Sequence, residues 1–105
     1  MFDLSVYKQR YFEVKLNNSL TIHIEMPTKK QLKNILSLTE NMKDGKISGE
    51  ELDKFYSAIV IALNKNKEKK KIEANYIEEN FNITALYGFF DEYYTWVSDN
   101  LNQKN

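Results

Sequence analysis

The segment Tyr11-Phe12-Glu13-Val14-Lys15-Leu16-Asn17-Asn18-Ser19-Leu20-Thr21-Ile22-His23-Ile24-Glu25-Met26 decides the fold class of this chain. Apolar and polar residues alternate with a period of two on both sides of Asn17-Asn18-Ser19, and this alternation is typical of strands. Asparagine tolerates a positive φ, so Asn17 and Asn18 can form a tight turn. The segment 11–26 therefore predicts a β-hairpin with one apolar face and one polar face.

The remainder of the chain predicts helices. Pro27 ends the second strand, and Thr28 can cap the helix that follows. Ser48 and Glu51 match the Ser-x-x-Glu capping box, which marks the start of another helix. Apolar residues at helical spacing then predict helices at about 28–43, 49–64, 73–80 and 83–101. The sequence predicts an α+β fold, mainly helical, in which an N-terminal hairpin precedes a bundle of about four helices in one domain, 1–105.

Composition limits the classes of function. The 105 residues include 15 basic and 15 acidic side chains and no cysteine. The balanced charge gives no net field to hold a polyanion, so we expect no nucleic-acid partner. Met1 to Arg10 lack the pattern of a signal peptide, and no apolar run approaches the length of a membrane span, so we expect no membrane partner and a cytoplasmic location.

The last predicted helix carries more aromatic residues than one core face needs. At about 100° per residue, its apolar residues form two stripes about a third of a turn apart. We assign the first stripe to the core: Ile83, Leu86, Phe90, Tyr94, Val97 and Leu101. The second stripe is our candidate surface for binding a partner: Phe89, Tyr93 and Trp96. Packing of the second stripe on the hairpin or on the helix at 49–64 is the equally weighted alternative.

Catalysis has little support in this sequence. The single histidine, His23, alternates with apolar residues on a strand, so we expect it to face solvent without a carboxylate neighbour. The acidic pairs Glu78-Glu79 and Asp91-Glu92 are adjacent in sequence and therefore point about 100° apart on a helix. We expect no enzymatic activity, no catalytic residues, no cofactor and no metal site.

The segment from Asp44 to Glu51 resembles the second half of an EF-hand calcium loop, with Gly45 at the turn position. The first half fails, because Glu40 and Met42 occupy positions that require short oxygen ligands. We interpret the segment as a corner between two helices. A small regulatory protein, calcium-responsive or directed at a host, remains the alternative function that this turn supports.

Five lysines between Lys65 and Lys71 form a basic run with one acid, Glu68. No aromatic residue is interleaved for stacking on bases, so a solvated loop is the favoured interpretation. A nucleic-acid accessory protein is the weaker alternative, and strongly salt-dependent binding would be its mark.

The order of these segments resembles small tail assembly chaperones of long-tailed bacteriophages and prophages. The resemblance rests on the strand pair closed by Pro27-Thr28-x-Lys30-x-Leu32, on Leu63-Asn64-x-Asn66-Lys67 followed by Lys70-Lys71-Ile72, and on Phe89-Phe90-x-x-Tyr93-x-x-Trp96. It implies a protein in the cytoplasm of the bacterial host that binds the tape measure protein and helps recruit tail tube subunits. It also implies a short product of a frameshifted pair. We expect self-association, because repeated small subunits can coat a long client.

Overall fold

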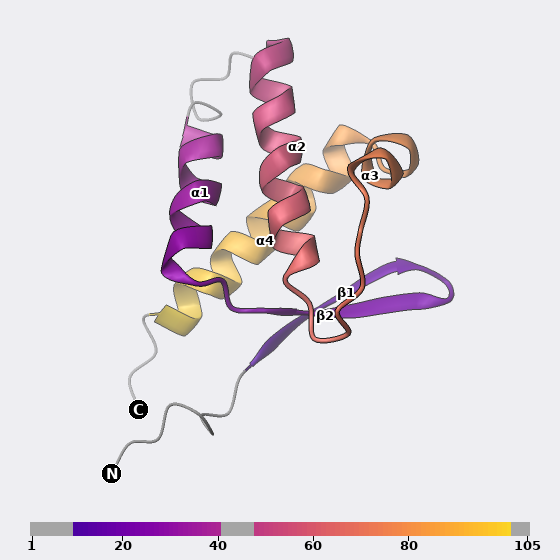
Figure 1. Ribbon diagram of the computed structural model, residues 1–105, viewed down its shortest axis with the longest axis vertical. Helices are drawn as coiled ribbons and strands as arrows, with labels where there is room; N and C mark the ends of the chain where they lie inside the picture. Colours follow the sequence, from indigo (N-terminus) through magenta and orange to yellow (C-terminus); the bar gives the residue numbers. More distant parts are fainter. Residues whose placement is uncertain (1–9, 41–47, 102–105) are drawn as a thin grey trace.

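The computed structural model describes residues 10–40 and 48–101. Figure 1 shows a two-stranded antiparallel hairpin followed by four helices, so the α+β, mainly helical fold class is confirmed. The elements are β1 (Tyr11–Asn17), β2 (Leu20–Glu25), α1 (Lys29–Thr39), α2 (Gly49–Asn64), α3 (Ala74–Asn80) and α4 (Ile83–Leu101).

The predicted boundaries agree closely with these elements. The helices expected at 49–64 and 83–101 have the predicted bounds, and α3 begins one residue later than expected. The first helix runs from Lys29 to Thr39, and residues 41–43 of its predicted range lie outside the described residues. Side-chain caps explain three of the starts, because Thr28, Ser48 and Asn82 each accept a hydrogen bond from a backbone N–H three residues ahead.

The hairpin pairs Phe12 with Ile24 and Val14 with Ile22. Asn17 forms the turn by accepting hydrogen bonds from the backbone N–H and the hydroxyl of Ser19, at 2.9 Å each. On the inner face of β2, Ile22 and Ile24 are fully buried. The outer edge of β2 is covered by the loop after α2, where the Glu25 N–H donates to the Lys65 carbonyl at 2.8 Å. The hairpin therefore faces the helices on one side and has one covered edge.

The core lies where α2 meets the other elements. Figure 1 shows α1 and α2 side by side, with α4 passing behind α2 and the hairpin at the end of the bundle where α2 finishes. Phe55, Ile59 and Leu63 on α2 are buried, as are Ile35 on α1 and Ile77 on α3. Burial of each such side chain stabilises the fold by about 1.5–3 kcal/mol. Among the described helices, α2 contributes the most buried residues to the core.

Candidate functional site

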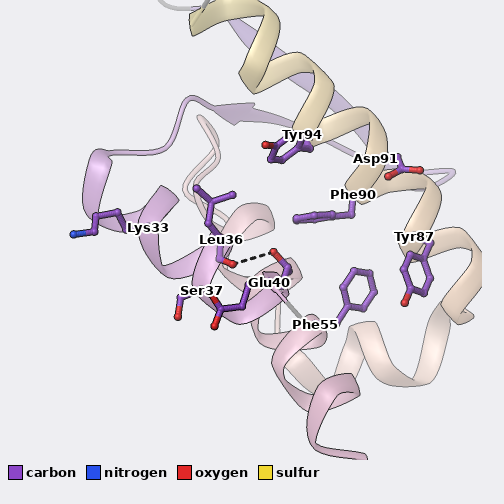
Figure 2. Close-up of a pocket in the computed structure, with 10 residues that line it drawn as sticks. Lys33, Leu36, Ser37, Glu40, Phe55, Tyr87, Phe90, Asp91 and Tyr94 are labelled. Carbon is purple, nitrogen blue, oxygen red and sulfur yellow. Dashed lines mark hydrogen bonds between the residues drawn. The ribbon is translucent and has the colours of Figure 1, made fainter. Parts of the chain in front are cut away.

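A groove of about 680 Å³ lies between α1, α2 and α4 (Figure 2). Its volume falls within the range of about 300–1,000 Å³ that is usual for binding pockets. Five side chains make its apolar wall, and we call this set the α1–α4 groove: Leu36, Phe55, Tyr87, Phe90 and Tyr94. Four of the five are aromatic, so the groove presents ring faces and edges to an occupant.

Aromatic rings build the floor of this groove. The Phe55 ring, which is buried, stacks on Tyr87 with the ring centroids 4.8 Å apart and the planes at 23°. Phe90 meets the same Phe55 ring edge-on at 5.8 Å. Tyr94 lies one turn further along α4, with its ring 6.5 Å from that of Phe90. The Phe55 ring on α2 contacts the Tyr87 and Phe90 rings on α4, so these two helices pack against each other through bulky aromatic side chains.

The α1 side of the groove leaves apolar surface open to solvent. Leu36 is 40% exposed, and Tyr94 across the groove is 47% exposed. A single exposed apolar residue is ordinary on a protein surface. Here two large ones line the same concave site with a buried aromatic floor, and such concentration is typical of a surface that contacts a partner.

Charged side chains stand at the rim of the groove. Lys33 and Glu40 lie on α1 and at its C-terminal cap, and Asp91 lies on α4 (Figure 2). All three are exposed. Within residues 10–40 and 48–101, none of the three forms an ion pair. The rim therefore offers one positive and two negative groups that the described part of the chain leaves unpaired.

In the structure the second aromatic stripe of α4 packs on the hairpin, which was the equally weighted alternative to a partner surface. Tyr93, predicted as part of the partner surface, is only 2% exposed, and its burial raises the pKa of its hydroxyl to about 12. Phe89 and Trp96 are half-buried against the hairpin, with the Phe12 ring 6.0 Å from Phe89 and 5.6 Å from Trp96. The exposed placement of Tyr93 was wrong, and the hairpin is what covers this stripe.

The predicted core stripe is correct for only part of its members. Leu86 and Val97 are buried and Phe90 is half-buried in the groove, whereas the other three members are exposed: Ile83, Tyr94 and Leu101. The residues buried along α4 are Leu86, Tyr93 and Val97, seven and four positions apart. Helical spacing identified two apolar stripes, and it could not tell which one the hairpin would cover.

His23 is not the isolated surface residue that its strand position predicted. Its backbone N–H donates to Glu68 at 2.8 Å, and its Nδ1 lies 2.5 Å from the other oxygen of that carboxylate. Its Nε2 lies 3.1 Å from Glu13 on β1. Hydrogen bonding to Glu68 is the main cause that raises the pKa of His23 above 6.5, and the Glu68 pKa falls mainly because its carboxylate accepts from the His23 backbone.

These contacts join β1, β2 and the loop after α2. The two carboxylates bind opposite nitrogens of the His23 ring, so they do not converge on one point. Within the described ranges, no group of three or more acidic or histidine side chains is placed to hold a metal ion.

The lysine loop between α2 and α3 is anchored by two asparagines. The buried Asn66 side chain donates to the carbonyls of Leu63 and Lys70 and accepts from the Lys70 N–H, all at 2.8–2.9 Å. Asn64 makes the equivalent pair of bonds with Ile72. The sequence favoured a solvated loop here, and these two polar anchors were not predicted. The two asparagines, two positions apart at the end of an apolar helix, were the signal that could have predicted the anchoring.

The EF-hand-like turn falls mostly outside the described residues, which omit 41–47. Of its ligand positions Glu40, Ser48 and Glu51 are described, and Glu51 lies on the first turn of α2, where its N–H donates to the Ser48 hydroxyl at 3.1 Å. Calcium binding there stays a prediction. Along the part of the chain that the structure describes, no helix has both the length and the apolar character that crossing a membrane requires.

Comparisons of the chain with protein-family models, with curated proteins and with solved structures found no match in any of the three.

Proposed function

We propose that this protein is a non-enzymatic tail assembly chaperone that binds a helical segment of the tape measure protein in the α1–α4 groove. The observation that carries the proposal is the groove itself, where exposed Leu36 and Tyr94 face each other over a floor of buried Phe55. A shallow apolar trough between helices suits the apolar face of an amphipathic helix. Aromatic walls also tolerate variation in the side chains that they contact, as a chaperone for many related segments requires.

The resemblance in segment order supplies the identity of the client. In this proposal the protein acts in the cytoplasm of the bacterial host, keeps apolar helices of the tape measure protein soluble and helps recruit tail tube subunits. Self-association would let several copies cover one long client. The alternative of a calcium-responsive regulator rests on the turn from Asp44 to Glu51, of which residues 44–47 lie outside the described residues.

Co-expression tests the proposal. The chain is produced together with a tape measure protein, and the amount of client that stays soluble and copurifies is measured. Leu36→Ser and Tyr94→Ser remove apolar surface from the groove, and we expect each to reduce copurification by about tenfold, the equivalent of about 1.4 kcal/mol. The matched control is Leu101→Ser, which changes an exposed leucine, 63% accessible, that does not line the groove.

Two outcomes of the co-expression experiment would contradict the proposal. If the two groove variants keep their helical circular dichroism and still solubilise the client as well as Leu101→Ser does, the groove is not the client site. If the unmodified chain captures no client at all, the chaperone function is wrong.

A further inference from the structure

We propose that the α1–α4 groove selects helices by a charge pattern. Such a helix carries an acidic residue and a basic residue two turns apart on one face, with apolar residues between them along that face. The inference rests on the proposed function, because it describes the occupant of the same site. It starts from the placement of Lys33 and Glu40 on α1.

The two rim charges of α1 share one face. Lys33 and Glu40 are seven residues apart, which is close to two full turns, so their side chains leave α1 in nearly the same direction. At 1.5 Å per residue the two positions are about 10 Å apart along the helix. Leu36 lies between them, at the apolar middle of the groove (Figure 2). The groove thus has a positive end at Lys33 and a negative end at Glu40.

Asp91 is the second negatively charged residue at the rim of the groove. It lies on α4, across the groove from α1 (Figure 2), and it has no ion-pair partner among the described residues. With Lys33 and Glu40 it completes the charged lining of the groove. An occupant that places an acidic group beside Lys33 and a basic group beside Glu40 neutralises those two charges, and Asp91 leaves the rim with one further negative group.

The charged residues at the two ends of α1 interact unfavourably with the dipole of that helix. The positive pole of a helix dipole is at the N-terminus, where acidic residues stabilise and basic residues destabilise. In α1 the first turn carries Lys29 and Lys30 and no acid, the last turn carries no basic residue, and Glu40 caps the C-terminus. This order is the reverse of the one that the dipole favours. Of these terminal charges Glu40 lines the groove, so a basic group on an occupant would offset its unfavourable position at the C-terminus of α1.

The spacing defines the occupant. A helix lying along α1 has the same rise per residue, so a glutamate at position i meets Lys33 when a lysine at i+7 meets Glu40. Apolar residues at i+3 and i+4 then face Leu36 and the aromatic wall. A helix with glutamate before lysine lies parallel to α1. A helix with lysine before glutamate presents the same pattern when it lies antiparallel.

Two synthetic helical peptides of the same composition test this inference against the full chain. Each has about four turns and one apolar stripe, one has glutamate seven positions before lysine, and the other has the two exchanged. A nitroxide on the N-terminus of each peptide broadens the NMR signals of nearby amides. We expect the first peptide to broaden signals around Lys33 and the second to broaden signals around Glu40.

Charge exchange on the protein supplies the second arm. In the double variant Lys33→Glu with Glu40→Lys, net charge is unchanged and we expect each peptide to reverse its direction. The matched control exchanges Glu50 and Lys54, an exposed ion pair on α2 at 3.5 Å that lies outside the groove, and should change nothing. A third peptide with both charges placed off this face should bind about two- to tenfold more weakly at low salt.

The failures are distinguishable. If the peptides bind in the groove without a preferred direction, or if the Lys33 and Glu40 exchange leaves direction unchanged, the charge pattern is overturned and the helix-binding groove stands. If no peptide binds at millimolar concentration while client still copurifies in a groove-dependent way, the pattern is also wrong. If neither the peptides nor the client bind, the proposed function falls together with this inference.

Discussion

Two adjacent tyrosines on α4 provide the sharpest test of which face is core. Tyr93 is 2% exposed and contacts the rings of Phe12, Phe89 and Trp96, whereas Tyr94 is 47% exposed in the groove. A fully buried tyrosine removes roughly 200 Å² from water, worth about 25 cal/mol per Å². Tyr93→Ala should therefore cost about 5 kcal/mol, at the upper end of the values for aromatic-to-alanine changes in a core. Tyr94→Ala should cost about 2 kcal/mol, because half of its surface is already in water.

The comparison is matched because both changes convert tyrosine to alanine inside one helix. The gain in helix propensity is the same in both variants and cancels in the difference. Urea unfolding followed by far-ultraviolet circular dichroism measures both free energies of unfolding. Tyr93→Phe is the conservative control and should stay within about 1 kcal/mol of the parent. Equal costs for the two alanine variants, or a larger cost at Tyr94, would refute the assignment of α4 faces.

Three further predictions concern stability. Asn66→Ala should cost about 2–4 kcal/mol, because it leaves buried backbone groups of the lysine loop without partners, and urea unfolding measures this loss. Gly88→Ala should raise stability by about 1 kcal/mol, seen as a higher Tm, because an added Cβ meets no atom within 4 Å and alanine favours the helix. The ion pair of His23 and Glu68 should make stability depend on pH. The raised pKa of His23 gives a contribution that is complete below pH 6.5 and is lost as the pH rises through that raised value, and the lowered pKa of Glu68 removes it again as the pH falls below 4.5 and through the lowered value.

Each of these predictions has a matched control. Asn80→Ala removes an exposed bond to the Tyr76 carbonyl and should cost under about 0.5 kcal/mol, so an equal loss at Asn66 would contradict the anchoring role. Gly49→Ala, in the first turn of α2, should gain less than Gly88→Ala. His23→Gln should flatten the pH profile of unfolding above pH 6.5, and an unchanged profile would show that the pair is not coupled to folding.

Sequence patterns predicted the elements well because local chemistry determines them. The alternation around Asn17 and the cap at Ser48 act within a few residues. The alternation is found as expected, and of the predicted capping box the Glu51 N–H to Ser48 hydroxyl bond is found. The contacts of His23 could not be predicted in this way, because its partner Glu68 is 45 positions away in the chain. Such a pairing depends on where the loop after α2 returns to β2.

The faces of α4 show the same limit. Periodicity measures only the angle between Tyr93 and Tyr94, and it contains no information on which element lies against each one. The face of α4 that becomes buried is set by Phe12 on β1, whose ring contacts Phe89, Tyr93 and Trp96. A hairpin that packed on the other side of α4 would have satisfied the same sequence pattern.

The aromatic excess of α4 has a physical reason once the hairpin is in place. One stripe fills the space under β1, and the other holds α4 away from α2 through the stacked rings of Phe55 and Tyr87 and the edge of Phe90. Smaller side chains at Tyr87 and Phe90 would let α4 approach α2, and the groove beside Leu36 would close. Aromatic side chains at these positions therefore do two things with the same atoms, because they separate the helices and form the wall of the site that the separation opens.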